Sequence, residues 1–134
     1  MALWLCKQEP DCYAFDDLAR DGTTQWDGVS NALARKHLRQ MRPGDRVFFY
    51  HTGKEKAVIG TATVSKTAYP DPKDEKLVVV ELAAGKALKR PVTLAEIKAD
   101  PALANTGLLR NSRLSVMPLT RAEFDRIVAL GSSD

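Results

Sequence analysis

The stretch MRPGDRVFFYH, residues 41–51, carries the clearest structural signal in this chain. Proline and glycine stand next to each other at positions 43 and 44 and predict a sharp turn. The segment Arg46–His51 then brings a valine, two phenylalanines and a tyrosine in direct succession. Because a continuous apolar and aromatic run is typical of a strand buried on both faces, we expect such a strand here.

The amino-terminal residues predict a strand followed by a short helix. A strand over residues 3–7 ends near Pro10, because proline disfavours helical geometry in the residue before it. Residues 14–20 are expected to form a helix that buries Phe15 and Leu18, which lie three positions apart.

A turn and a longer helix are expected before the central stretch. Residues 21–28 are rich in aspartate and glycine and predict a turn, although they contain Trp26. A helix of about ten residues runs over positions 30–40, with Ser30 or Asn31 as its N-cap.

Two further strands are expected after the central stretch. Residues 57–67 alternate apolar and other side chains, and residues 77–82 form another apolar run. The proline-rich segment 69–72 is expected to be the turn between them. Gly60, in the middle of the first of these strands, indicates a bulge or the close approach of another group.

The last third predicts two helices and one short strand. Thr93 and Thr120 each begin a Thr-x-x-Glu capping box, and residues 113–117 read as a strand between the two helices. Strands in mixed order, without regular alternation with helices, predict an α+β fold around a small, strongly bent sheet or barrel. We expect residues 1–134 to form one domain, since no linker or repeat divides them.

The composition is that of an ordinary globular protein: 44% of the 134 residues are hydrophobic and 28% are charged, which argues against disorder. The sequence shows no long apolar run and no secretory signal, so we expect no membrane partner. The expected location is the cytoplasm in a bacterium or the nucleus in a eukaryote. Cys6 and Cys12 are expected to be reduced thiols in or near the core. With only His37 and His51 to join them, neither a metal nor a cofactor is expected.

The net charge of +3 is unevenly distributed. Residues 1–30 carry two basic and six acidic side chains, whereas residues 31–134 carry eighteen basic and eleven acidic ones. Basic side chains that gather in one short segment are typical either of a phosphate-binding surface or of a solvated helix face. The candidate phosphate contacts are Arg35, Lys36, Arg39 and Arg42.

The motifs of several enzyme classes are missing from the sequence. It contains no Gly-rich dinucleotide loop, no P-loop and no Gly-x-Ser-x-Gly elbow. No signature supports a nucleophilic pair of Cys6 or Cys12 with a histidine. Instead, aromatic and polar side chains gather at strand ends and in a loop, where aromatic faces can stack on bases and polar groups can read their edges. An enzyme is therefore not expected, and nucleic acid is a permitted partner. Trp26 either plugs the edge of the core or offers a flat face for stacking.

Six ordered segments resemble the EVE domain family. They are WLCKQEP at residues 4–10, WDGVSN at residues 26–31, MRPGDRVFFYHT at residues 41–52, AYPD at residues 68–71, PVTL at residues 91–94 and RLSVMP at residues 113–118. The resemblance covers nearly all of residues 2–130. It implies a PUA-like fold related to YTH domains, and recognition of modified bases, notably 5-methylcytosine and 5-hydroxymethylcytosine in DNA, by an aromatic pocket that holds a flipped base.

The resemblance also implies a set of ligand-binding residues. Trp26 would be the principal stacking wall, and Lys7 with Gln8 would contact the base or its phosphate. The remaining members are Asn31 at the base edge, Tyr50, His51 and Thr52 as another wall, and Arg113 and Ser115 at the rim. The chain departs from the family pattern at Gln8, Ser30 and Thr52, and it lacks tryptophans in the strand over residues 77–82.

Three functions remain open from the sequence. The first is a reader of modified bases in DNA, and the second is an RNA-binding accessory domain that recognises modified tRNA or another structured RNA. The third is a small nucleotide hydrolase that uses His51. No coiled-coil pattern is present, so we expect a monomer.

Overall fold

The computed structural model describes residues 2–132 and contains a six-stranded mixed sheet with the strand order β2-β5-β4-β3-β1-β6. β1 and β3 pair in parallel, and the other neighbouring strands pair antiparallel. The strands are β1 (Leu3–Gln8), β2 (Thr23–Trp26), β3 (Arg46–His51), β4 (Ala57–Asp71), β5 (Asp74–Thr93) and β6 (Val116–Leu119).

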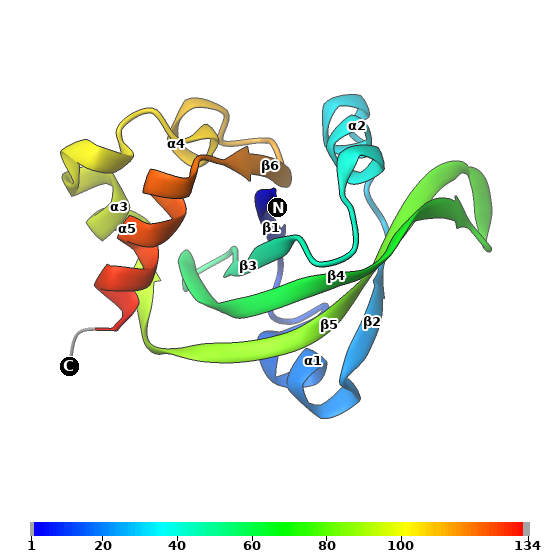
Figure 1. Ribbon diagram of the computed structural model, residues 1–134, viewed down its shortest axis with the longest axis horizontal. Coiled ribbons are helices and arrows are strands. Elements are labelled where there is room, and N and C mark those ends of the chain that lie inside the picture. Colours follow the sequence, from blue (N-terminus) through cyan, green and yellow to red (C-terminus); the bar gives the residue numbers. More distant parts are fainter. Residues whose placement is uncertain (1, 133–134) are drawn as a thin grey trace.

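Five α-helices and one 3-10 turn surround the sheet. They are α1 (Phe15–Asp21), α2 (Ala32–Gln40), α3 (Leu94–Ala99), η1 (Pro101–Leu103), α4 (Gly107–Arg110) and α5 (Arg121–Gly131). The helices α3, α4 and α5 gather at one end of the molecule, and the tip of the long β4–β5 hairpin projects at the other end (Figure 1). This arrangement confirms the expected α+β class. No helix among residues 2–132 is both long and apolar enough to cross a membrane.

The expected burial of β3 on both faces is confirmed. On one face Phe48 stacks on Phe124 of α5, with ring centroids 4.1 Å apart. On the other face the ring of Phe49 meets the edges or faces of Phe15 and Trp26 at nearly right angles. Since β3 lies between β1 and β4, this strand joins the two halves of the hydrophobic core.

Several segments around the sheet differ from what the sequence predicts. Residues 23–26 form strand β2 instead of a turn, and Trp26 pairs with Val80 of β5. The expected turn at residues 69–72 lies mostly within β4, and the strand expected at residues 113–117 is β6, which begins three residues later. Both long strands extend well beyond the expected limits, and η1 and α4 were not expected. Pairing with a neighbouring strand overrides local turn preference in these segments.

Gly60 allows another group to approach the sheet, as expected. A Cβ atom at this position would lie only 2.5 Å from the Phe15 ring, and the register of β4 shifts on either side of Gly60. The ring of Phe15 therefore occupies the space that any other side chain would need. This contact fixes α1 against the sheet.

The predicted helix starts are confirmed by their capping bonds. The side chain of Asn31 accepts a hydrogen bond from the backbone N–H of Ala34 at 3.0 Å, so Asn31 rather than Ser30 caps α2. Thr93 and Thr120 both form the reciprocal bonds of a capping box. These caps satisfy donors that a helix cannot pair internally.

A buried carboxylate fixes the beginning of β1 to the turn before β3. Asp45 is only 4% exposed and accepts hydrogen bonds from the Trp4 indole at 3.0 Å, the Arg42 N–H at 2.9 Å and the Ala2 N–H at 3.0 Å. Burial alone would raise the pKa of Asp45, but these donors outweigh it and lower the pKa. The turn is therefore held by an ionised side chain.

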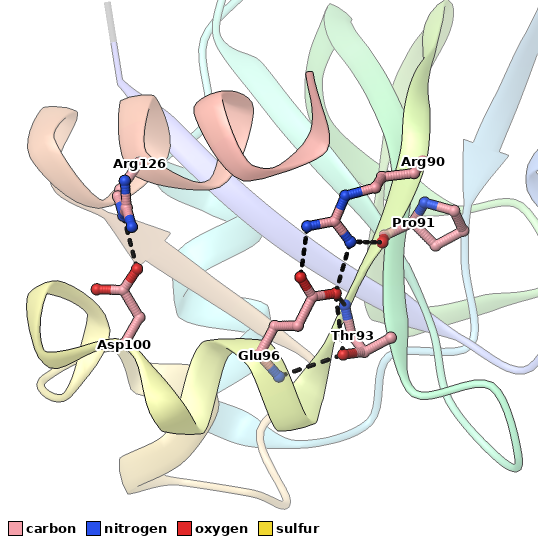
Figure 2. Close-up of polar contacts among 6 residues, drawn as sticks. All are labelled: Arg90, Pro91, Thr93, Glu96, Asp100 and Arg126. Carbon is pink, nitrogen blue, oxygen red and sulfur yellow. Dashed lines mark hydrogen bonds and ion pairs between the residues drawn. The ribbon is translucent and has the colours of Figure 1, made fainter. Parts of the chain in front are cut away.

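A second carboxylate holds α3 against β5. Glu96 accepts two hydrogen bonds from the Arg90 guanidinium, at 2.9 and 2.5 Å, and further bonds from the backbone and hydroxyl of Thr93 (Figure 2). Arg126 of α5 makes a similar contact with Asp100 at 2.6 Å (Figure 2). Both ion pairs connect the C-terminal helices to neighbouring segments.

We expect the Glu96 contacts to make stability depend on pH. The Arg90 guanidinium, followed by the Thr93 N–H, lowers the pKa of Glu96 to about 2. The unfolded value is about 4.3, so the contribution is present above that pH and is lost as the pH falls toward 2. Glu96→Gln should therefore lower the Tm at pH 7 and leave it nearly unchanged near pH 2, in thermal unfolding followed by circular dichroism. Glu75→Gln, at an exposed position, is the control; an equal loss of Tm at both pH values would contradict the assignment.

Candidate nucleic-acid interface

A cavity of about 270 Å³ lies beside Trp26, between the end of β1, the segment that leads to α1, and β2. Both aromatic and polar side chains reach it. Its lining residues are Gln8, Cys12, Tyr13, Thr24, Gln25, Trp26 and Asp27. Only Gln8 and Trp26 among these were expected from the sequence. An aromatic residue three positions after the KQEP segment was the available signal for Tyr13.

Trp26 is a buried wall of this cavity and not an open stacking platform. Its side chain is 3% exposed, and its ring packs against Phe49 with centroids 5.2 Å apart and planes at 89°. Residues 21–28 were expected to form a turn, but they place Trp26 at the end of a paired strand, and its ring is held in the core. The cavity expected beside the ring is present.

Polar groups at this cavity provide both donors and acceptors. The Gln8 side-chain oxygen accepts a hydrogen bond from the Glu9 N–H at 2.9 Å, which leaves the Gln8 amide nitrogen to donate. Tyr13 donates its hydroxyl proton to Asp21 at 2.8 Å. Asp27 is exposed at the rim, and no ion pair involves it within residues 2–132.

Cys12 lies at the same rim and not in or near the core, where it was expected. It is exposed, whereas Cys6 is fully buried. Desolvation, and then the nearby Glu9 carboxylate, raise the pKa of the Cys12 thiol. This shift favours the protonated thiol, which lies 3.7 Å from a Glu9 carboxylate oxygen and donates weakly to it.

A second cavity, of about 250 Å³, lies at the ends of the parallel strands β1 and β3. It is lined by Lys7, Tyr50, Thr52, Gly53, Lys56, Leu94, Leu108 and Ser112. The Lys7 ammonium donates to the Ser112 carbonyl at 3.0 Å and lies 5.9 Å from the centre of the Tyr50 ring. Burial lowers the pKa of Lys7 and raises that of Tyr50.

The sheet separates the two cavities, because successive residues of a strand point to opposite faces. Lys7 pairs with Tyr50, and Gln8 pairs with His51, across the parallel strands β1 and β3. His51 shares its face with Phe49, with ring centroids 5.5 Å apart, and therefore with Trp26. Of the three residues expected to form one wall, Tyr50 and Thr52 line the same cavity, whereas His51 lies on the other face.

His51 is committed to structural hydrogen bonds. It is 5% exposed, its Nε2 accepts the Phe15 N–H at 3.0 Å, and its Nδ1 lies 2.9 Å from a Glu55 carboxylate oxygen. This pattern requires the proton on Nδ1, with Nε2 as the acceptor. Since both ring nitrogens are engaged, His51 holds the start of α1 and has no free nitrogen to act as a base.

Three other expected site residues line neither cavity. Asn31 caps α2, and Arg113 is exposed in the segment before β6. Ser115 contributes its backbone carbonyl, which accepts the Lys7 N–H at 2.8 Å. In residues 2–132, no three His, Cys, Asp or Glu side chains come together as metal ligands would.

The four candidate phosphate contacts, three in α2 and Arg42 in the turn after it, divide into one structural residue and three free ones. Arg35 donates to the Lys76 carbonyl at 2.9 Å and so ties α2 to the β4–β5 hairpin. Lys36, Arg39 and Arg42 are exposed, and no carboxylate within residues 2–132 pairs with them. These three side chains form a basic surface, which we call the α2 basic surface.

The chain is similar to several known proteins over nearly its whole length. Human thymocyte nuclear protein 1 is 32% identical over 163 aligned residues, which cover 95% of this chain and 72% of that protein. An NMR structure of a Rhodopseudomonas palustris protein is 43% identical, with a TM-score of 0.93, and covers 98% of this chain and 93% of that one.

A crystal structure of human thymocyte nuclear protein 1 in complex with DNA containing 5-methylcytosine is also similar. It has 30% identity and a TM-score of 0.93, and the match covers 100% of this chain and 99% of that one. These likenesses confirm the PUA-like α+β architecture expected from the sequence. The EVE domain model matches residues 2–130. The chain therefore belongs to the EVE domain family.

Proposed function

We propose that this protein binds DNA containing 5-methylcytosine and holds the modified base, turned out of the duplex, in the cavity beside Trp26. The observation that carries the proposal is the similarity, over the whole chain, to the human protein whose crystal structure contains such DNA. The cavity adds support, because its walls offer an aromatic edge together with polar groups.

The chemistry of the cavity suits a cytosine base. Cytosine presents an amino donor beside ring-nitrogen and carbonyl acceptors. The free amide nitrogen of Gln8 can donate to an acceptor of the base, and the Asp27 carboxylate can accept from its amino group. Turning a base out of the stack costs a few kcal/mol. Packing against the aromatic walls of the cavity and the polar bonds would offset that cost.

The α2 basic surface is proposed to contact the DNA backbone. Lys36, Arg39 and Arg42 are exposed cations without a carboxylate partner in the described structure. Phosphate contacts of this kind release counterions, so the affinity should fall as salt is raised. The proposal assigns no catalytic step to the protein, since both ring nitrogens of His51 are already engaged.

Fluorescence anisotropy with matched oligonucleotides tests the proposal. DNA with one 5-methylcytosine should bind about tenfold more tightly than the same DNA with cytosine, and more tightly than the corresponding RNA. Gln8→Ala should weaken binding of the methylated DNA about fivefold, because one hydrogen bond is worth about 1 kcal/mol.

Gln40→Ala, an exposed glutamine that lines neither cavity, is the matched control and should bind as the wild type does. Equal affinity for methylated and unmethylated DNA would overturn the proposed selectivity. Tighter binding of the modified RNA would favour the RNA-binding function. An unchanged affinity of Gln8→Ala would place the base outside this cavity.

A further inference from the structure

The cavity around Tyr50 has the features of a binding site in its own right. It lies across the sheet from Trp26 and is enclosed by the ends of β1 and β3, the loop before β4, and the helices α3 and α4. Its volume of about 250 Å³ suits a small ligand. Neither Gln8 nor Trp26 lines it, so it is separate from the proposed base cavity.

Tyr50 carries a polar group without a partner in this cavity. Tyr50 is only 3% exposed, and no group within residues 2–132 makes a hydrogen bond with its hydroxyl. The hydroxyl is not among the fully buried polar atoms that lack a partner, so its oxygen keeps contact with solvent at the cavity. It can therefore donate a hydrogen bond to a ligand without giving up a bond within the protein.

The other polar groups at the cavity select for negative charge. The Lys7 ammonium uses one donor for the Ser112 carbonyl and keeps two others, and Lys56 makes no ion pair within the described residues. Thr52 adds a hydroxyl, and no aspartate or glutamate lines the cavity. Two cations without a carboxylate in a partly enclosed space favour an anionic ligand.

The number of donors indicates which anion fits. Lys7, Tyr50, Thr52 and Lys56 offer four separate donor groups. A phosphate group spreads its acceptors over three oxygens and carries nearly two negative charges, whereas a carboxylate has two oxygens and one charge, so a phosphate suits these donors better. Leu94 and Leu108 add an apolar wall against which the carbon skeleton attached to the phosphate can pack.

We propose that this cavity is a separate anion site that binds the phosphate group of a nucleotide through Lys7, Tyr50 and Lys56. The phosphate could belong to a DNA strand bound by the protein or to a free mononucleotide. The chemistry is the same in both cases, and the site does not depend on the proposed base cavity.

Isothermal titration calorimetry of the full chain with ribose 5-phosphate tests this site. The probe carries a phosphate and no base, so its binding does not involve base recognition, and the two proposals can fail independently. Ribose 5-phosphate should bind with a millimolar or lower Kd, and uncharged ribose should bind at least about tenfold more weakly.

Two variants and one control locate the binding. Tyr50→Phe and Lys56→Gln should each weaken ribose 5-phosphate binding about fivefold, as expected for the loss of one hydrogen bond. Lys54→Gln changes an exposed lysine of the same loop that does not line the cavity, and it should bind as the wild type does. Tyr50→Phe removes only an unpaired hydroxyl, so its Tm should not fall.

Three results would overturn the site: equal binding of ribose and ribose 5-phosphate, no binding of either in the millimolar range, or wild-type affinity of Tyr50→Phe. The source of the phosphate follows from DNA binding by Lys56→Gln. A weaker affinity for the methylated oligonucleotide would identify a strand phosphate. An unchanged DNA affinity, together with weaker ribose 5-phosphate binding, would identify a free mononucleotide.

Discussion

Trp26→Ala is expected to lower the free energy of unfolding by about 3–5 kcal/mol, the usual cost of removing a large buried aromatic side chain. Trp26 is 3% exposed and packs against Phe49 in the main core. Its removal would leave a void next to the existing cavity. Urea denaturation followed by far-UV circular dichroism measures this loss.

Trp26→Phe is the matched variant, because it keeps an aromatic ring against Phe49 and should lose clearly less stability. A difference of less than about 1 kcal/mol between Trp26→Ala and the wild type would show that the ring does not support the core. DNA affinity of Trp26→Ala is informative only under conditions where the variant is folded. For this reason Gln8→Ala is the cleaner test of base binding.

Asp45→Ala is expected to lower the free energy of unfolding by about 3 kcal/mol or more, because three donors lose their acceptor together. The indole N–H of Trp4 is buried, so water cannot replace the carboxylate there without rearrangement. The Arg42 N–H would lose the bond that closes the turn before β3. Urea denaturation at pH 7 measures the difference from the wild type.

The pH dependence gives this prediction a second readout. The pKa of Asp45 is lower in the folded protein than the unfolded value of about 3.9. Its contribution is therefore present above that pH and is lost as the pH falls through the folded value. The difference in the free energy of unfolding between the wild type and Asp45→Ala should therefore become smaller at acidic pH.

Asp11→Ala, at an exposed position, is the control and should match the wild type. If the difference in the free energy of unfolding between the wild type and Asp45→Ala stayed constant from pH 7 to below the folded pKa, this would contradict an ionised Asp45.

The sequence predicts those parts of the fold that depend on residues close to one another along the chain. The aromatic run in β3 and the caps at Asn31, Thr93 and Thr120 are local signals, and the structure confirms them. Strand β2 could not be predicted from such local signals, because the aspartate and glycine around it favour a turn. Only its pairing with β5, more than fifty residues later, makes Trp26 part of the sheet.

The candidate site shows a similar limit. The family resemblance points to the ends of β1 and β3, but it does not say which face each side chain takes. The alternation of a strand would have separated Tyr50 from His51. Lys56, Leu108 and Ser112 reach the second cavity from a loop and from the region of α4, which was not expected, so no local pattern could identify them.

The division of β1 between two faces also has an evolutionary consequence. Position 8 opens to one cavity and position 7 to the other, although one peptide bond joins them. A substitution at Gln8 can therefore alter the preference of one cavity for its ligand, while Lys7 is retained at the other cavity. Descendants of such a domain can diverge in what they recognise without rebuilding the scaffold.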